Sequence, residues 1–514
     1  MKQRLSRFRL VVLIIPFVLA FIGYYLVYSQ NPDIEPRYVL TSCLFNSFKI
    51  YATAVMVGLD EMNPWLEVAR WSGALVTTSM ILIVLKHIAS GVKLRWKLRR
   101  PDTVVVHGDG VQQDTIVRAL GKSGVAAKGD ISFRPATHVL AFENDGAAIR
   151  YIMENEQKLF TNDKAVYFSS SEYEASDYAQ SGLTVTNTAV NCARLYWQEH
   201  WLRDEKIRKV AIVGFGHYGQ QLLEQALLVN VLPWRGPVEY HIYGSDGKTF
   251  LSWRPELRHC LTINHSDDVQ DSLHFHPSLR EMGIDHIQGM DRIIITQDSV
   301  DENLLLLNHL IHTGLNGVIH IRCGKKLLKQ LQYLPERRMA QGLLTIASFG
   351  DEDELFSRDV ILHGKLCEAA KNAHINYVTQ SSAENIRRKY PSCTRYEGCK
   401  EHGPCAGCPH APATWDDLTP FEKSSNIAAA DHAPIKRYLL RQADSKGGVE
   451  SWHQELCRIE HIRWSRFYYL HNWHYSPQRD DARRLHPSLQ PFDELSISEQ
   501  EKDWWAYETI LKEA

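Results

Sequence analysis

Apolar residues are unevenly distributed along this chain, and the densest runs lie within residues 1–100. An uncharged run extends from Leu10 to Tyr28, and a second, almost uncharged run extends from Trp71 to Ala89. At a rise of 1.5 Å per residue, a helix of either run is about 28 Å long, close to the thickness of a bilayer's hydrocarbon core. The pattern predicts an α-helical membrane module over 1–100 with two spans, at about 10–28 and 71–89.

Basic residues flank each of the two runs at one end only. They precede the first run and follow the second: Lys2, Arg4, Arg7, Arg9, Lys93, Arg95, Lys97, Arg99 and Arg100. Because basic residues are retained on the cytoplasmic side, both termini are predicted to be cytoplasmic in a multi-pass protein of the cell inner membrane. Tyrosines at the end of the first run and the lack of a clean cleavage site favour a retained anchor over a signal peptide.

The loop between the two runs contains a moderately apolar segment, 39–60. Its polarity predicts a re-entrant or an interfacial helix rather than a third span. Two spans around a re-entrant segment is the plan of a potassium-channel pore, and Val57-Gly58-Leu59-Asp60 is similar to the filter sequence V-G-Y-G-D. One glycine and the tyrosine are missing, and a filter needs its full stack of carbonyls to hold ions. Potassium selectivity is therefore not predicted.

Beyond residue 100, short β-branched runs alternate with helical segments, which is typical of parallel α/β sheets. The pattern predicts a Rossmann-like domain over 101–200 and a second over 206–380. The predicted strands are 103–107, 138–142, 165–168, 209–213, 238–243, 292–296, 318–322 and 343–347. A Cys-rich insertion at 390–412 and a small, mainly helical domain over 415–514 are predicted to follow.

The second Rossmann-like domain begins with a G-x-G-x-x-G motif between a predicted strand and a predicted helix. The motif is Gly214, Phe215, Gly216, His217, Tyr218 and Gly219. Its glycines let the backbone approach a pyrophosphate, and the helix N-terminus attracts the negative charge. Asp246, just past the next strand, is the candidate ribose ligand. NAD or another adenine nucleotide is the predicted cofactor, and a site for a different nucleotide or for none is the alternative.

The first Rossmann-like domain carries a degenerate copy of this motif. Gly108-Asp109-Gly110 follows strand 103–107, but Gln113 stands where the third glycine belongs. A side chain at that position opposes close packing of helix on strand. The first copy is therefore predicted to be structural and to bind no nucleotide.

The second domain resembles the Trk-type (TrkA-N, RCK) regulatory domains, a likeness that covers about 209–348 and is carried by Gly214, Gly216 and Gly219. Those domains are Rossmann-like, follow a two-span pore, regulate potassium transport and bind nicotinamide or adenine nucleotides. The resemblance implies nucleotide sensing linked to ion transport in a prokaryotic membrane protein. No Tyr/Lys or His/Asp pair suited to hydride transfer accompanies the motif, so no enzyme and no catalytic residue is predicted. A membrane-bound NAD-dependent oxidoreductase is the alternative.

Charge and cysteine content add two expectations. Lys and Arg number 58 against 60 Asp and Glu, for a net charge of −2. Nucleic-acid-binding proteins carry a basic surface, so no nucleic-acid partner is predicted. A cluster with a C-x-x-C pair predicts a structural zinc site, with reduced thiols or an iron–sulfur cluster as alternatives. The candidate ligands are Cys393, Cys399, Cys405 and Cys408.

The last hundred residues carry a distinctive string of aromatic, histidine and acidic residues. It reads E-H-x-x-W from Glu460, W-x-Y-x-x-x-R-D-D from Trp473 and L-H-P-x-L from Leu485. The string is similar to the ryanodine receptor repeat (RyR) domain, although Asn472 and Ser476 stand where that family has glycine. The likeness covers about 451–514 and implies, in prokaryotes, a module that recognises nucleotide-derived signals.

Aromatic side chains beside an arginine and paired aspartates can stack a base and hydrogen-bond its ribose or phosphate. The candidate ligand-binding residues are Trp464, Trp473, Tyr475, Arg479, Asp480, Asp481 and His486. The alternative is that these aromatics belong to the core and that the arginine forms a structural ion pair.

Together these features predict a membrane-anchored nucleotide-sensing protein, a ligand-gated regulator or effector of potassium-channel-like plan. Its predicted partners are the membrane and a nucleotide-derived small molecule. Because two helices cannot enclose a pore, a homo-oligomer is predicted. A non-catalytic membrane scaffold that binds other proteins is the alternative.

Overall fold

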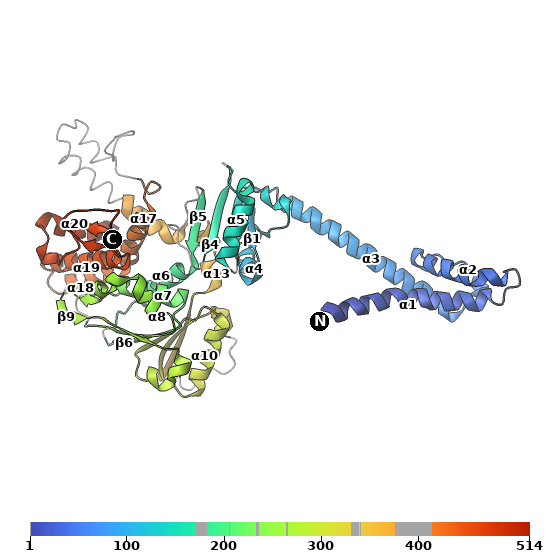
Figure 1. Cartoon of the computed structure of the whole chain (residues 1–514), viewed down its shortest axis with the longest axis horizontal. Coiled ribbons are helices and arrows are strands. Elements are labelled where there is room, and N and C mark those ends of the chain that lie inside the picture. The colour runs from blue at the N-terminus through green and yellow to red at the C-terminus, as the bar shows by residue number, and fades with distance from the viewer. Residues whose placement is uncertain are drawn as a thin grey trace. The chain divides into compact units, whose positions relative to one another are not determined.

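The computed structural model describes residues 2–513 except 143, 162, 171–181, 205, 233–235, 264–265, 330–338, 340 and 376–413. The chain divides into two compact units, Met1–Arg100 and Pro101–Ala514. Figure 1 shows the helices and strands of each unit. The predicted Cys-rich insertion lies outside the described residues.

The first unit is entirely helical in its regular structure. Its elements are α1 (Lys2–Tyr28), α2 (Pro36–Lys49), the 3-10 turns η1 (Ile50–Ala52) and η2 (Leu59–Glu61), and α3 (Pro64–Lys97). Prolines begin α2 and α3, where the missing N–H costs nothing, and Asn63 caps α3 by accepting a hydrogen bond from the Leu66 N–H. The segment 39–60, predicted to be re-entrant or interfacial, consists of most of α2 followed by the two 3-10 turns.

Close contacts tie the chain between α2 and α3 to both long helices. The Tyr24 hydroxyl of α1 accepts a hydrogen bond from the Met56 N–H at 3.1 Å. A Cβ on Gly73 of α3 would lie 2.9 Å from the Ile50 carbonyl oxygen, so glycine permits this close approach. The first unit therefore has a packed arrangement of its own.

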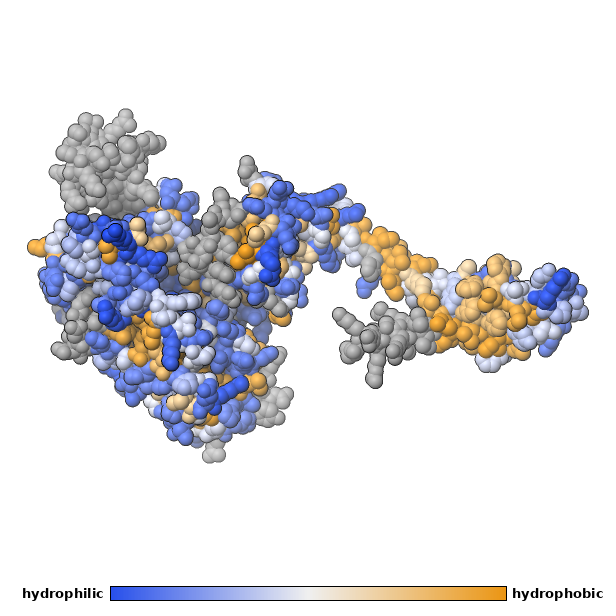
Figure 2. Space-filling view, in the orientation of Figure 1, coloured by the Kyte–Doolittle hydropathy of each residue, from blue (hydrophilic) through white to orange (hydrophobic). Residues whose placement is uncertain are grey.

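Apolar side chains cover much of the surface of the first unit, as Figure 2 shows. Leu75 and Ile83, for example, are 67% and 59% exposed. Among the described residues, α3 is the one helix long and apolar enough to cross a membrane, and Leu13–Tyr28 is a shorter apolar helix. An exposed apolar surface of this kind marks an interaction with lipid or protein. The predicted span 71–89 lies within α3, whereas a two-span module remains a prediction.

The second unit begins with a five-stranded sheet. Its strands are β1 (Val104–Gly108), β2 (Gly124–Ala126), β3 (Thr137–Ala141), β4 (Ala165–Ser170) and β5 (Leu183–Asn187), with helices α4 (Gly110–Ala119), α5 (Asp145–Leu159) and α6 (Thr188–His200). The strand order is β2-β1-β3-β4-β5, and every pair is parallel. This is the 2-1-3-4-5 order of doubly wound α/β folds.

A six-stranded sheet follows. Its strands are β6 (Lys209–Val213), β7 (Glu239–Tyr243), β10 (Ser272–His276), β11 (Arg292–Ile295), β12 (Gly317–Arg322) and β13 (Leu344–Phe349). The order is β10-β7-β6-β11-β12-β13, again all parallel, which is the 3-2-1-4-5-6 order of a Rossmann fold. The prediction of tandem parallel α/β sheets is therefore confirmed.

Helices and short elements complete the second sheet. They are α7 (His217–Val229), α8 (Gly247–Trp253), α9 (Leu279–Met282), α10 (Val300–His312), α11 (Lys325–Leu328), α13 (Glu352–Leu355), α14 (Arg358–Ile361) and the antiparallel pair β8 (Thr262–Ile263) and β9 (Ser266–Gln270). Phe356 and Ile361, although they follow the second sheet in sequence, pack in the core of the first sheet beside Val104 and Ile116. The two sheets are thus joined by shared packing as well as by the chain.

The C-terminal region is mainly helical, as predicted. It contains α17 (Pro420–Asp431), α18 (Ala433–Ser445), α19 (His453–Leu470), α20 (Ile497–Glu513) and the short strands β14 (His474–Tyr475) and β15 (Leu485–His486). A capping box between Thr419 and Glu422 begins α17. Ile459 and Phe467 of α19 share one continuous apolar core with Leu223 of α7, so this region is packed on the second sheet.

Candidate functional site

The glycine motif lies between β6 and α7, at the carboxyl end of the second sheet. Gly214 has φ of +103°, and a Cβ there would lie 2.6 Å from the Gln297 backbone nitrogen. A Cβ on Gly219 would lie 2.0 Å from the Gly214 carbonyl oxygen. Both positions require glycine, because α7 passes so close to the ends of β6 and β11. The strand order reverses between β6 and β11, and ligands of open α/β sheets bind at this switch point.

The carboxyl end of β7 reaches the same place. A Cβ on Gly244, directly after β7, would lie 2.7 Å from the Cβ of Phe215 in the motif. Phe215 is buried, with its ring centroid 5.1 Å from that of Phe250 in α8. Asp246 immediately precedes α8, so the loop that carries it passes beside the motif. Its role as a ribose ligand remains a prediction.

A carboxylate of the same chain lies at the N-terminus of α7. Asp298 follows β11, and its Oδ1 accepts a hydrogen bond from the Tyr218 N–H at 3.4 Å. A Cβ on Gly216 would lie 2.0 Å from Asp298 Oδ2, while His217 is exposed alongside. Because the first amides of a helix stabilise an anion, Asp298 takes the position that a phosphate would need. Sequence reasoning missed Asp298, since an acidic residue after a strand has no distinguishing signal.

Arg322, at the end of β12, fixes the loop that carries this carboxylate. Its Nη2 donates to the carbonyl oxygens of Gln297 and Asp298 at 2.7 and 2.6 Å. The guanidinium carbon lies 3.9 Å from the centroid of the Tyr218 ring, and burial raises the pKa of Tyr218 to about 12. The tyrosine is therefore neutral at physiological pH, and a cation–π contact connects β12 to the start of α7.

The first sheet carries the degenerate glycine turn in a different state. A Cβ on Gly108 would lie 1.6 Å from the Ala141 carbonyl oxygen, so the first glycine is required here too. Gln113, in place of the third glycine, donates from Nε2 to the Val106 carbonyl oxygen at 2.9 Å. The side chain that replaces glycine thus bonds to the strand of its own turn.

An aromatic cluster forms in the C-terminal region. Its members are Phe421, Trp464, Tyr468, Trp473 and His486. The ring centroid of Tyr468 lies 4.4 Å from that of Trp464 and 5.0 Å from that of Trp473, and Phe421 of α17 stacks on Trp473 at 5.3 Å. Tyr468 follows Trp464 by one helical turn, so helix periodicity could have identified it. Phe421 lies outside the RyR-like string, and no sequence signal pointed to it.

An arginine and a carboxylate lie at the edge of the aromatic cluster. Arg479 Nε donates to Asp481 Oδ1 at 2.7 Å, and its Nη1 lies 3.3 Å from His486 Nε2. The arginine side chain is 55% exposed. Burial, with the charge of Arg479, lowers the pKa of His486 to about 4, so the imidazole is neutral and can accept from the arginine. Trp464, Trp473, Arg479, Asp481 and His486 are therefore brought together.

The other two predicted ligand residues lie elsewhere. Tyr475 of β14 is 52% exposed. Asp480 stabilises a turn: it exchanges backbone hydrogen bonds with Leu485, and its Oδ1 accepts from the Arg483 N–H at 3.1 Å. Neither side chain contributes to the aromatic cluster.

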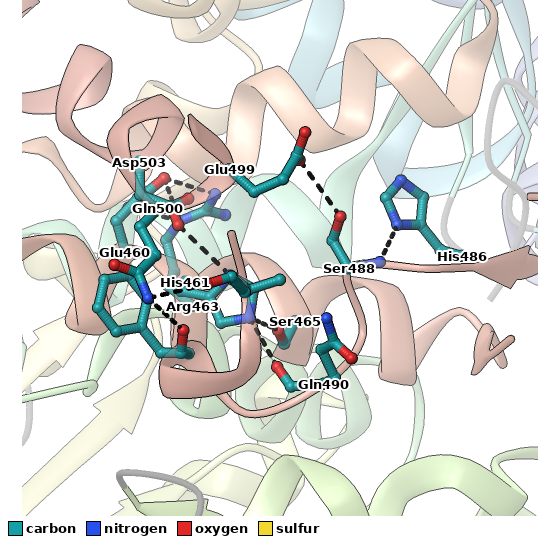
Figure 3. A network of polar contacts seen from close by, with 12 residues as sticks. Glu460, His461, Arg463, Ser465, His486, Ser488, Gln490, Glu499, Gln500 and Asp503 are labelled. Carbon is teal, nitrogen blue, oxygen red and sulfur yellow. Dashed lines mark hydrogen bonds and ion pairs between the residues drawn. The ribbon is translucent and has the colours of Figure 1, made fainter. Parts of the chain in front are cut away.

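The first two residues of the RyR-like string belong to the buried polar network shown in Figure 3. Glu460 pairs with Arg463 at 2.7 Å and with Lys436 of α18 at 2.8 Å. Burial alone would raise the pKa of Glu460, but these two charges outweigh it and lower the pKa to about 2. His461 lies 3.4 Å from Asp503 of α20. These residues hold α18, α19 and α20 together, so their function is structural.

Polar contacts also connect the C-terminal region to the glycine motif's own helix. Asp431 at the end of α17 accepts from Gln225 of α7 at 3.0 Å and from Arg194 of α6 at 2.7 Å. Arg466 of α19 donates to the Leu227 carbonyl oxygen of α7 at 2.8 Å. Arg194, Asp431 and Arg466 are nearly completely buried. Helix α7 therefore has the candidate phosphate site at one end and the C-terminal region along its body.

The RyR domain family matches residues 444–513, which confirms the C-terminal resemblance. No curated protein matches the chain. Among solved structures, GsuK bound to ADP is similar at 13% identity and TM-score 0.29, covering 71% of this chain and 100% of that one. A point mutant of GsuK gives 12%, 0.30, 70% and 98%, and the A chain of dipicolinate synthase from Bacillus subtilis gives 11%, 0.22, 51% and 91%. TM-scores this low assign no function to this chain.

The cysteines predicted to bind zinc lie outside the described residues, so that site remains a prediction. Within the described part of the chain, one group of histidine and carboxylate side chains has ligand atoms close enough to share an ion. It consists of Glu239, His241 and His274 of the second sheet.

Proposed function

We propose that this chain is a membrane-anchored nucleotide sensor, in which the second Rossmann-like domain binds the phosphates of an adenine nucleotide at the N-terminus of α7. The observation that carries the proposal is the pair of enforced glycines, Gly214 and Gly219, at the switch point of a 3-2-1-4-5-6 sheet. They bring backbone amides and a helix N-terminus to the surface where a pyrophosphate would lie. No catalytic step is assigned to the site.

Helix α7 provides a physical route from the nucleotide to the C-terminal region. Its N-terminus receives the phosphate, and its body contacts Asp431 and Arg466 through buried hydrogen bonds. A shift of α7 on binding would have to be accommodated by these contacts, because close-packed interiors rearrange between discrete states rather than deform freely. The aromatic cluster with Arg479 would then respond to the nucleotide or bind a second one.

The first unit would supply the output at the membrane. Helix α3 has the length and the apolar surface to cross a bilayer, and α1 would be the second span. Both termini would lie in the cytoplasm of the inner membrane, and a homo-oligomer would be needed to enclose a conducting path. Ion conduction regulated by the nucleotide is the proposed output.

A membrane scaffold is the second candidate function, and Asp298 favours it. A carboxylate already bound at the N-terminus of α7 supplies the negative charge that a phosphate would bring. If Asp298 stays there permanently, the second domain binds no nucleotide and the RyR domain binds a protein.

Ligand-induced thermal stabilisation of the full chain in detergent separates the two candidates. A nucleotide at a hundred times its Kd should stabilise the sensor by about 2.7 kcal/mol. ADP, ATP, NAD⁺ and NADH are the ligands to test. Gly216→Val should abolish the shift, because its side chain fills the space of the incoming phosphate. Gly324→Ala is the control, since a Cβ there meets nothing within 4 Å.

No shift with any of these nucleotides would contradict the sensor and support the scaffold. A shift that persists in Gly216→Val and disappears in Arg479→Gln would place the nucleotide in the C-terminal region instead. Arg479 is half exposed, so its substitution should leave the fold intact.

A further inference from the structure

Histidines gather on one face of the strand pair β7 and β10. The strands run parallel, with His241 opposite His274 and Glu239 opposite Ser272. Since side chains alternate between the faces of a sheet, Glu239 and His241 share their face with Ser272, His274 and, two residues further on, His276. The opposite face carries Tyr240 and Ile242, which are fully buried in the apolar core.

This face is unusual for a parallel α/β sheet. Such sheets are normally covered by helices on both sides, and their strands are apolar on both faces. Here β10 is an edge strand, His274 is exposed, and Glu239 and His241 are partly buried. The polar face is therefore open to solvent and accessible to an ion.

The side chains lie close enough to share one ion. One ligand atom from each of Glu239, His241 and His274 lies within 4.8 Å of the other two. Ligands of a tetrahedral zinc ion at 2.0–2.1 Å are about 3.3 Å apart, so small rotations about the side-chain bonds would complete the site. Lys209 Nζ lies 3.5 Å from Glu239 Oε2, and the ion would share this carboxylate with it.

His276 and Ser272 provide the outer contacts that metal-binding imidazoles usually have. His241 Nε2 lies 3.5 Å from Glu239 Oε2, while its Nδ1 lies 3.2 Å from His276 Nε2. With Nε2 on the ion, Nδ1–H donates to His276, which fixes the tautomer and the ring orientation. Ser272 Oγ lies 3.0 Å from His274 Nε2 and orients that ring in turn.

The histidines are also in the protonation state that binding requires. Burial, opposed by Glu239 but reinforced by the neighbouring imidazole, lowers the pKa of His241. Burial and the charges of His241 and His274 lower that of His276. Both rings are therefore neutral at pH 7 and offer a lone pair to a metal ion.

We propose that Glu239, His241 and His274 bind a divalent transition-metal ion, zinc or a neighbour with the same preference for imidazole and carboxylate, with His276 as the residue that positions His241. Two histidines and a glutamate leave a coordination position for water or an exogenous ligand. The site is separate from the cysteine cluster and from the glycine motif, and it does not depend on the proposed nucleotide sensing.

The test is metal stoichiometry and affinity of the untagged full chain in detergent, after chelation and equilibrium dialysis against Zn²⁺. His274→Asn should remove one zinc per chain or weaken its binding at least tenfold. His312→Asn, which removes another exposed histidine on α10, is the matched control and should change nothing. Any zinc held by the cysteines is common to all these proteins and cancels in the comparison.

Two further variants keep the test independent of folding. Glu239→Gln preserves the side chain's shape and should also release the ion, while the Tm of the metal-free protein stays unchanged. His276→Gln should keep the stoichiometry but weaken binding by roughly 10–100-fold, as loss of an outer contact does. Equal zinc content and affinity in the wild type, His274→Asn and Glu239→Gln would overturn the proposal.

Discussion

The two glycine turns of this protein share a strand, two glycines and a helix, yet they differ in how the turn is closed. In the second sheet, Gly219 lets α7 approach the strand end, and the α7 amides face Asp298, a group that can be displaced. In the first sheet, Gln113 closes the turn by bonding to Val106. The difference teaches that the third position of the motif decides between a site that can accept a ligand and a turn satisfied by its own chain.

The strongest way to break this comparison is to give the second turn the residue of the first. Gly219→Gln places a Cβ 2.0 Å from the Gly214 carbonyl oxygen, so α7 must move. The cost should be about 3 kcal/mol, as for severe overpacking, with loss of nucleotide binding. Thermal unfolding of the full chain measures the first effect, and Gly324→Gln, which meets open space, is the control. Equal Tm values for the two variants would contradict the packing argument.

Acid should also separate the two sheets. His107, just before the first turn, and His138 are buried together, and burial lowers their pKa values to about 3 and about 4. The unfolded state, with histidines near 6.5, binds more protons at mildly acidic pH, so this stability is complete above about pH 6.5 and is lost as pH falls. A drop to pH 5 should cost about 2 kcal/mol per histidine.

Hydrogen exchange of the strand amides, corrected for the intrinsic rate, reports this loss. The strand β12 of the second sheet carries one such histidine, His320, whose pKa burial lowers to about 3. Exchange should therefore accelerate more in β1 and β3 than in β12 between pH 7 and pH 5. Equal acceleration in all three strands would show that the paired histidines contribute nothing specific.

Removing the bond that closes the first turn should have a smaller effect. Gln113→Leu leaves the Val106 carbonyl without this donor, at a cost of about 1 kcal/mol. Gln112→Leu is the neighbouring control, because Gln112 makes only longer contacts of 3.3 and 3.5 Å, to Ser169. Similar unfolding midpoints for the two variants would mean that Gln113 does not close the turn.

The smallest predicted change sharpens the second turn. Asp298→Asn removes the negative charge from the N-terminus of α7 and should raise nucleotide affinity about fivefold, for roughly 1 kcal/mol. Asp301→Asn, on the exposed first turn of α10, should leave the affinity unchanged. Isothermal titration with ADP and NAD⁺ measures both, and a weaker affinity in Asp298→Asn would mean that the carboxylate assists the ligand.

The sequence predicted the sheets better than the site. Alternating apolar runs located the central strands, because buried parallel strands are continuously apolar. It missed β10 (S-L-H-F-H), whose polar face is open at the sheet edge. Asp298 was missed because it meets α7 only after folding, and Phe421 because it joins the aromatic cluster from a helix outside the RyR-like string.

The measurement that tests the central claim most directly is hydrogen exchange of the full chain with and without saturating ADP or NAD⁺. A sensor that works through α7 should gain protection at the amides of 214–220 and, in the same experiment, change protection in α17 and α19, which contact α7 through Asp431 and Arg466. Unchanged exchange at 214–220 with every nucleotide would contradict the account.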